Sequence, residues 1–275
     1  MKVKANTIAV IGIACLLTFP SGVKIQQQAE EVDPIRKVKQ NAFKKGEFLR
    51  FDVSYGVFDT AEATLEIKQS SEKVAWRNTM HIVGKGWSKG ALSWFFKVED
   101  HYETYMDEDA ILPWKFIRHV REGGYELDRE IHFNQYSDKA FVFQNDKKEY
   151  QVAPNTQDLL SAFYYARTLD LQHAKVGQEF VINTFFDREM YPLKIKFLGK
   201  EIIKTKLGRF SCLKFRPLVE QGRVFKEEED MTIWISNDAN KVPIRVTSDL
   251  LVGSINMDLV EYKNLIHPLS QPGWQ

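Results

Sequence analysis

The sequence predicts an all-β fold: one mainly antiparallel sheet, curled into a barrel or half-barrel, with one main helix packed on it. Apolar and polar residues alternate with a period of two over most of the chain, turn-forming residues separate these runs, and only one segment shows clear helical spacing. Many consecutive strands with few helices argue against parallel βαβ units. Curling would best bury the apolar face of so long a sheet.

The start of the chain has the layout of a secretory signal peptide. Lys2 and Lys4 precede an apolar run from Ile8 to Phe19, and turn-forming residues follow it. The run is too short to span a bilayer comfortably. We therefore expect a signal peptide at residues 1–22 and a periplasmic or otherwise exported protein, with no transmembrane span after the signal is removed.

Three further regions follow the expected signal peptide. The polar, charged stretch 23–45 predicts a flexible spacer, residues 46–266 predict a single antiparallel β domain, and residues 267–275 predict a C-terminal tail. Hydrophobic residues make up 44% of the chain, which is enough for a sizeable core. A formal charge of +1 gives no electrostatic reason to expect nucleic acid as a partner.

The two cysteines have different expected fates. Cys15 loosely matches the lipobox at which bacterial lipoproteins are acylated, although the apolar run continues past it, so lipidation stays an open alternative. After signal removal Cys212 would be the only cysteine, which excludes an intrachain disulfide. Because Cys212 lies in an alternating run, we expect it to be a buried and unreactive thiol.

The alternation is clearest near the start of the expected domain. Apolar residues occupy the odd positions from Leu49 to Tyr55, and the pattern resumes from Ala61 to Ile67, which predicts an amphipathic hairpin. Its odd face should point to the core and its charged even face to water. Further strands are expected at 73–84, 97–106, 114–121, 125–134, 139–144, 179–186, 191–198, 209–218, 229–236, 241–248 and 251–262.

Two segments interrupt the strand pattern. After Pro154, the residues up to Asp158 can start a helix, and the apolar residues from Leu159 to Arg167 recur at helical spacing. One helix lying on the sheet is the natural interpretation. The aromatic-rich segment 87–96 predicts a short helical turn or a loop.

Three sequence motifs lie in these predicted elements. They are the strand Gly46-Glu47-Phe48-Leu49-Arg50-Phe51-Asp52-Val53-Ser54-Tyr55-Gly56, the helix opener from Gln157 to Arg167, and the strand Leu207-Gly208-Arg209-Phe210-Ser211-Cys212. With this combination the chain resembles the exported bacterial proteins of the domain of unknown function 3108 (DUF3108) family. The resemblance implies a mainly antiparallel β domain in the cell envelope and carries over no activity. In layout alone the chain is also similar to periplasmic lipoprotein-localisation carriers, but a shared fold does not establish function.

The residues that could carry chemistry form no recognisable catalytic or metal-binding motif. The six histidines lack the i, i+4 spacing of a helical zinc site, although His119 and His132 could meet across a hairpin and His101 lies near Asp100 and Glu103. Ser161 lies in no nucleophile elbow, and its hydroxyl should bond to the backbone. The acidic run 227–230 could bind calcium, but a contiguous run alternates between faces and is more typical of a solvated turn. We therefore expect no catalytic residues, no metal and no cofactor.

Aromatic residues and one arginine are the candidate ligand contacts. Arg167 could grip an anionic head group at the rim of an apolar hollow, or it could pin the helix to the sheet by an ion pair or a carbonyl bond. Asp158 lies about 180° from Arg167 around an ideal helix, so the two cannot share one small site. Ordinary core packing would also explain the rings. The residues assigned to the ligand hypothesis are Trp87, Trp94, Phe96, Trp114, Phe163, Tyr164 and Arg167.

Three functions fit these observations. The preferred hypothesis is a non-catalytic carrier or binding module whose partner is a lipid or other amphiphile, held by burial of apolar area. The second is a module that binds an envelope glycan or protein through exposed rings or an unpaired strand edge. The third is a hydrolase with residues converged from separate strands, which needs a polar cleft containing His101, His119 or His132 beside carboxylates. The sequence sets neither the oligomeric state nor the identity of the ligand.

Overall fold

The computed structural model describes residues 33–56, 58–90, 92–218, 231–249 and 253–271. The described residues from Pro34 on form one compact unit. The expected signal peptide and the acidic run 227–230 lie outside the described residues. Among the helices of the described part, none has the length and apolar character needed to cross a membrane.

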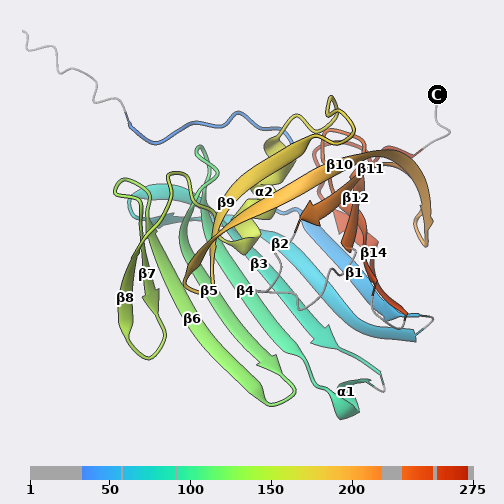
Figure 1. Ribbon diagram of the computed structural model, residues 1–275, viewed down its shortest axis with the longest axis horizontal. Coiled ribbons are helices and arrows are strands. Elements are labelled where there is room, and N and C mark those ends of the chain that lie inside the picture. The colour runs from blue at the N-terminus through green and yellow to red at the C-terminus, as the bar shows by residue number, and fades with distance from the viewer. Residues whose placement is uncertain (1–32, 57, 91, 219–230, 250–252, 272–275) are drawn as a thin grey trace, which may run out of the picture. The chain divides into compact units, whose positions relative to one another are not determined.

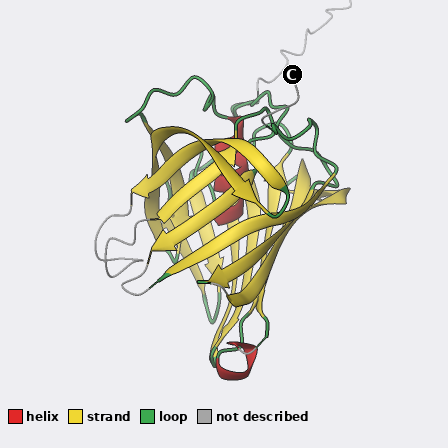
Figure 2. Ribbon diagram, turned by 90° about the vertical axis from the view of Figure 1, so that its right-hand side faces the viewer, coloured by secondary structure: helices red, strands yellow, loops and turns green. Residues whose placement is uncertain are grey.

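The expected all-β fold is confirmed. All strands of the described chain belong to one antiparallel sheet, which is curled and not closed (Figures 1 and 2). The strands are β1 (Phe48–Tyr55), β2 (Phe58–Val74), β3 (Arg77–Ser88), β4 (Glu99–Asp107), β5 (Pro113–Glu122), β6 (Tyr125–Asn134), β7 (Lys139–Phe143), β8 (Lys147–Gln151), β9 (Glu179–Phe186), β10 (Glu189–Thr205), β11 (Gly208–Leu218), β12 (Met231–Ser236), β13 (Pro243–Asp249) and β14 (Ser254–Lys263).

The strand order shows how the chain builds this sheet. The order is β8-β7-β6-β5-β4-β3-β2-β1-β14-β13-β12-β11-β10-β9, so two meanders meet where β1 pairs with β14. The two edge strands, β8 and β9, are consecutive in the chain, and helix α2 (Leu159–Thr168) lies between them in sequence. Figure 2 shows this helix inside the curl of the sheet. The helix therefore covers the inner face instead of extending the sheet.

The predicted hairpin forms as expected. Strands β1 and β2 pair antiparallel, with Phe51 opposite Ala63. Leu49 and Phe51 are buried, whereas Arg50 and Asp52 on the other face of β1 are only half-buried. Alternation of this kind places successive side chains on opposite faces, which is why the sequence pattern located the strand.

Two expectations need correction. Strand β8 was not expected, because its residues from Lys147 to Glu149 are exposed at the sheet edge and show no apolar alternation. Residues 34–45 were expected to be flexible spacer, but Phe43 and Ala42 are buried in the core. Arg36 also donates to the carbonyl oxygen of Ala110 at 3.0 Å. A few apolar residues dispersed among charged ones anchor this stretch. Because the overall composition of the stretch is polar, it did not indicate that these residues would be buried.

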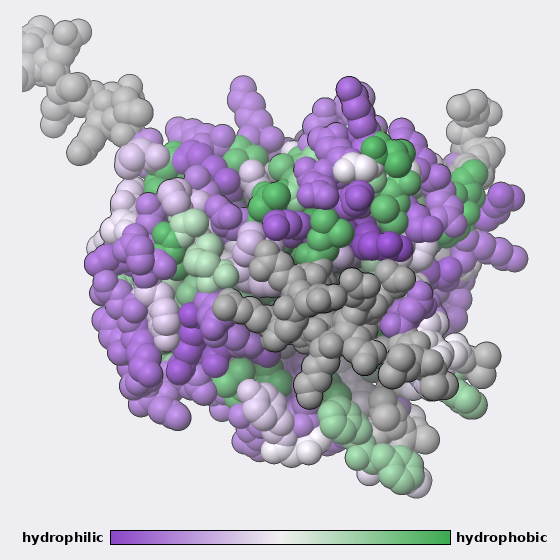
Figure 3. Space-filling model, viewed as in Figure 1, coloured by the Kyte–Doolittle hydropathy of each residue, from purple (hydrophilic) through white to green (hydrophobic). Residues whose placement is uncertain are grey.

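The surface of the unit is mixed in polarity. Figure 3 shows hydrophilic side chains over much of one face, with apolar ones gathered over β9 and β10 and at the end that carries α1 (Leu92–Phe95). Helix α1 lies between β3 and β4, where the sequence predicted a short helical turn or a loop. Among the apolar residues over β9 and β10, Val181 is 56% exposed and Ile202 is 52% exposed.

Candidate ligand site between helix α2 and the sheet

Helix α2 begins with a buried capping box. The Asp158 side chain accepts a hydrogen bond from the Ser161 backbone N–H at 2.8 Å, and the Ser161 hydroxyl accepts one from the Asp158 N–H at 2.9 Å. Thr104 on β4 donates its hydroxyl to the same carboxylate. The Ser161 hydroxyl therefore bonds to the backbone, as predicted, and the cap joins α2 to the middle of the sheet.

Burial dominates the electrostatics of this cap. The Asp158 side chain is fully enclosed, and this desolvation raises its pKa to about 6, although the bonds from Thr104 and Ser161 favour the ionised form. The role of Asp158 is therefore structural: its carboxylate caps α2 and fastens the helix to Thr104. It lies at the opposite end of α2 from Arg167, in agreement with the sequence argument that the two serve no common site.

The two long faces of α2 have different surroundings. Leu160 and Tyr164 pack into the main core with Phe43 and Phe116. The other face carries an apolar stripe at i, i+3, i+4 and i+7, which is the spacing of one helical face. The stripe consists of Leu159, Ala162, Phe163 and Ala166.

This stripe forms one wall of an apolar pocket. The pocket has a volume of about 220 Å³, and almost all of its surface is apolar. The sheet supplies the opposite wall from β9 to β12: Ile182, Leu193, Ile195, Phe215, Ile233 and Ile235. Leu171, Arg167 and Lys241 complete the lining.

Small residues on the helix explain why this space is open. Ala162 and Ala166 face the sheet where larger side chains would fill the gap. Leu159, at the first turn of α2, is 47% exposed although it is apolar and lines the pocket. A sheet wall of branched aliphatic residues without a packed counterpart is unusual inside a protein, since interiors are normally close-packed. The pocket is therefore the best candidate ligand site.

Arg167 pins the helix to the sheet at one end of the pocket. Its Nη1 and Nη2 bond to Glu47 Oε1 and Oε2 at 2.5 and 2.8 Å, and both side chains are almost fully buried. Its remaining bonds go to the carbonyl oxygens of Asn240 and Ala42, each at 2.9 Å. The guanidinium thus makes the ion pair and carbonyl bonds of the pinning interpretation, and it is occupied by protein groups.

At this end of the pocket, Lys241 is the polar group that can still donate hydrogen bonds to a ligand. Its Nζ donates to the Arg167 carbonyl oxygen at 2.9 Å, and no carboxylate of the described residues lies within ion-pair distance of it. Burial lowers the pKa of Lys241, while the field of Asp170 favours the charged form. A half-buried ammonium with two further N–H groups could bind an oxygen of a ligand.

The seven residues of the ligand hypothesis do not converge on one place. Phe163 and Arg167 line the pocket, whereas Tyr164 is buried on the other face of α2. Trp114 is buried elsewhere, and its indole N–H donates to Asp107 at 3.0 Å. The remaining members lie near the end of the sheet formed by β3, α1 and β4: Trp87, Trp94 and Phe96.

Sequence reasoning missed most of the pocket lining. Those residues come from four strands separated by many positions, so no local motif joins them. A signal was present in α2, where Ala162 and Ala166 share the stripe of Leu159 and Phe163. Small residues at two successive turns of an otherwise bulky face can indicate a gap. Glu47 was also missed as the partner of Arg167, because 120 positions separate the two residues.

His101 on β4 and His119 on β5 are paired in the ladder and have partly exposed side chains. His101 Nε2 lies 3.0 Å from Glu103, and His119 Nδ1 lies 2.6 Å from Asp128. The side chains of His101 and His119 are 37% and 49% exposed. His119 lies opposite Asp128 in the ladder, so it does not meet His132. Within the described part of the chain, no group of three potential ligands is placed to hold a metal ion.

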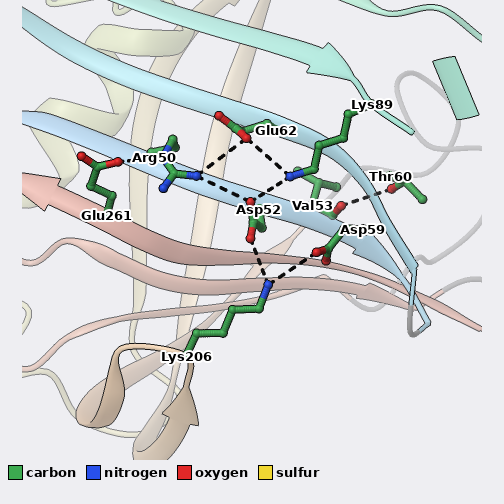
Figure 4. Close-up of polar contacts among 9 residues, drawn as sticks. All are labelled: Arg50, Asp52, Val53, Asp59, Thr60, Glu62, Lys89, Lys206 and Glu261. Carbon is green, nitrogen blue, oxygen red and sulfur yellow. Dashed lines mark hydrogen bonds and ion pairs between the residues drawn. The ribbon is translucent and has the colours of Figure 1, made fainter. Parts of the chain in front are cut away.

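A second polar cluster joins segments that are distant in the sequence (Figure 4). Asp52 on β1 lies 3.1 Å from Lys89 and 3.0 Å from Lys206, and Arg50 lies 2.8 Å from Glu261. Burial opposes ionisation of Asp52, but the bonds from the two lysines outweigh it and lower its pKa. Each charge in this cluster has an opposite charge beside it. The cluster therefore has a structural role, in which ion pairs join neighbouring segments of the sheet.

Comparison with known proteins places the chain in a family. A family model described as "Protein of unknown function (DUF3108)" matches residues 50–260. The chain belongs to the DUF3108 family. The sequence resemblance is thereby confirmed, while no curated protein matches this DUF3108 protein in sequence.

Several solved structures are similar to this DUF3108 protein in fold. A β-barrel-like protein of the DUF1849 family from Brucella abortus has a TM-score of 0.50 and 9% identity, covering 82% of this chain and 99% of its own. A hypothetical protein from Chlamydia trachomatis has a TM-score of 0.37 and 10% identity, covering 84% and 93%. A DUF1089 family protein from Pseudomonas aeruginosa has a TM-score of 0.35 and 10% identity, covering 70% and 92%. The first similarity supports the β-barrel-like fold and does not extend to function.

Proposed function

We propose that this DUF3108 protein is an exported, non-catalytic carrier that holds the apolar chain of an amphiphile in the pocket beside α2. The observation that carries the proposal is the pocket itself: about 220 Å³ of apolar space between a helix and a sheet. Its export is supported by the signal-like layout of the first residues.

The pocket dimensions suit a single chain. The stripe from Leu159 to Ala166 extends about 10 Å at 1.5 Å per residue. The volume exceeds the cavity of about 150 Å³ that accepts benzene in an engineered protein, and is below the roughly 300 Å³ of the smallest drug-sized pockets. A stretch of about six methylenes would gain about 5 kcal/mol on leaving water, at roughly 0.8 kcal/mol each.

Lys241 supplies the proposed polar contact for the head group. It lines the pocket at the pinned end of α2, and its ammonium is not neutralised by a described carboxylate. An anionic or oxygen-rich head group beside Lys241 would leave the apolar chain to run along the stripe toward Leu159. A fatty acid or a similar single-chain anionic amphiphile fits this arrangement.

Fluorescent fatty-acid binding tests the proposal with matched variants. Ala166→Phe adds a ring inside the pocket, whereas Val181→Phe adds bulk to an exposed residue next to the pocket-lining Ile182. We expect Ala166→Phe to weaken binding at least tenfold and Val181→Phe to leave it unchanged. Lys241→Met should weaken binding of the fatty acid more than that of the corresponding alcohol. Saturable binding that survives Ala166→Phe would show that the ligand lies elsewhere.

A further inference from the structure

Exposed aromatic side chains concentrate at one end of the sheet. Because the strands are antiparallel neighbours, the turns β1–β2, β3–β4, β5–β6 and β13–β14 all lie at that end. Seven of the 14 large apolar side chains that are exposed in the described chain belong to these turns, and six of the seven are aromatic. The seven, called here the aromatic rim, are Tyr55, Phe58, Trp94, Phe95, Phe96, Tyr125 and Ile255.

The helix α1 carries the most exposed members of the aromatic rim. Trp94 is 88% exposed and Phe95 is 86% exposed. Figure 2 shows α1 projecting beyond the strands at the end away from α2. Two adjacent large rings held almost wholly in water on a projection are costly for a protein unless another surface covers them.

Hydrogen bonds and packing hold the aromatic rim together. The Gly123 N–H donates to the Lys97 carbonyl oxygen at 2.9 Å, and Phe96 packs so closely over Gly123 that a Cβ there would lie 2.2 Å from its ring. The Lys89 N–H likewise donates to the Thr60 carbonyl oxygen at 2.8 Å. The rings of neighbouring turns are therefore presented together by a bonded scaffold.

Several charged side chains beside the aromatic rim are paired with one another. Lys97 lies 2.8 Å from Glu99, Lys89 lies 3.1 Å from Asp52, and Arg121 contacts Asp128 at 2.8 Å. Among the described residues of this end, these pairs leave no concentrated basic patch for an anionic partner and no concentrated acidic patch for a cationic one. The described residues therefore favour a partner surface with no net charge.

We propose that the aromatic rim docks on a lipid surface of zwitterionic head groups, with Trp94 and Phe95 inserted at the interface. Tryptophan and tyrosine favour the head-group region because each joins an apolar ring to a polar group, and phenylalanine favours the adjoining acyl boundary. A fluid lipid surface accommodates a projecting tip with separated rings, whereas a rigid protein partner would need a matching hollow. The proposal concerns an interaction surface and does not depend on the pocket being a ligand site.

The pocket lies where such docking would be useful. Arg167 is held at Glu47, just before the start of β1, whereas the aromatic rim contains the end of β1. Asp158 is held at Thr104 in the middle of β4. The exposed Leu159 end of the pocket is consequently nearer to the aromatic rim than the Arg167 end.

Vesicle flotation tests the docking proposal. The protein, isolated from the envelope, would be floated with phosphatidylcholine vesicles, and a double variant Trp94→Ser/Phe95→Ser would be compared with Trp76→Ser. Trp76 is 96% exposed in the β2–β3 turn, at the opposite end of the sheet, and so provides a matched control. All three proteins share the same N-terminus, so any contribution from that region cancels. Circular dichroism and urea unfolding would show that the variants remain folded.

The outcomes are distinct. We expect the wild type and Trp76→Ser to bind the vesicles alike, the double variant to bind at least tenfold more weakly, and high salt to change little. Equal binding of the double variant and the wild type would overturn the proposal. So would binding only to anionic vesicles with loss at high salt, or no vesicle binding by the wild type. Loss of fatty-acid binding in the pocket would not affect this result, so the two proposals fail separately.

Discussion

The buried pair of Glu47 and Arg167 gives the sharpest test of how the inner helix is held. The substitution Glu47→Gln keeps the shape of the side chain but removes its charge. Both side chains are almost fully buried, and the guanidinium makes two bonds to the carboxylate at 2.5 and 2.8 Å. The variant would therefore leave a cation enclosed with its two carbonyl partners alone.

The size of the effect follows from burial. Removing one partner of a buried ion pair costs about 3–5 kcal/mol, because the remaining charge is uncompensated in a poorly polarisable interior. The total stability of a domain is about 5–15 kcal/mol, so the variant should lose a large fraction of it. The same substitution at Glu66, whose ion pair with Lys68 is more than a third exposed, should cost less than about 1 kcal/mol.

Urea unfolding followed by circular dichroism measures both values. The midpoint and slope give the free energy of unfolding for the wild type, Glu47→Gln and Glu66→Gln. In the double variant Glu47→Leu/Arg167→Met no buried charge remains, so it should be more stable than Glu47→Gln. It should still lose about 1–2 kcal/mol relative to the wild type, because the Ala42 and Asn240 carbonyls lose their donor. A Glu47→Gln loss below about 1 kcal/mol would refute the description of this pair as buried.

Three further predictions concern the cap, the thiol and the aromatic rim. Because burial raises the pKa of Asp158 to about 6, the free energy of unfolding should fall by about 3 kcal/mol as pH rises from about 4 to 6. Unfolding measured across this range should show that Asp158→Asn removes this loss. An unchanged pH profile in that variant would contradict the prediction. Burial raises the pKa of Cys212 to about 12, so peptide mapping should find it unlabelled by thiol reagents until the protein unfolds; labelling of the native protein would show that it is accessible. Gly123→Ala should destabilise more than Gly124→Ala in urea unfolding, because both have positive φ but only Gly123 is covered by Phe96; equal losses would count against that packing.

The sequence predicted local structure well where each strand has one buried face. The alternation of Leu49, Phe51 and Val53 with charged residues located β1 and its pairing with β2. Strand β8 was missed because an edge strand of lysine and glutamate side chains carries no such pattern. The packing of Phe43 was missed for a related reason, since one apolar residue in a polar stretch makes no period.

The site was less predictable because it is made by tertiary contacts. The spacing of Leu159, Phe163 and Arg167 indicated a helix, but which face of it would lack a packed counterpart depends on strands β9 to β12. The seven predicted contacts were grouped by residue type, and their type does not distinguish a pocket wall from a core or a surface. Phe163 and Arg167 line the pocket because they lie on the helix that forms one of its walls.

The central claim is that the pocket beside α2 holds an amphiphile. Native mass spectrometry of the protein purified without detergent, followed by lipid extraction, tests it most directly. We expect one single-chain amphiphile per protein that leaves on denaturation, and we expect its occupancy to fall sharply in Ala166→Phe but not in Val181→Phe. A wild-type protein that is empty and takes up no added fatty acid would contradict the account.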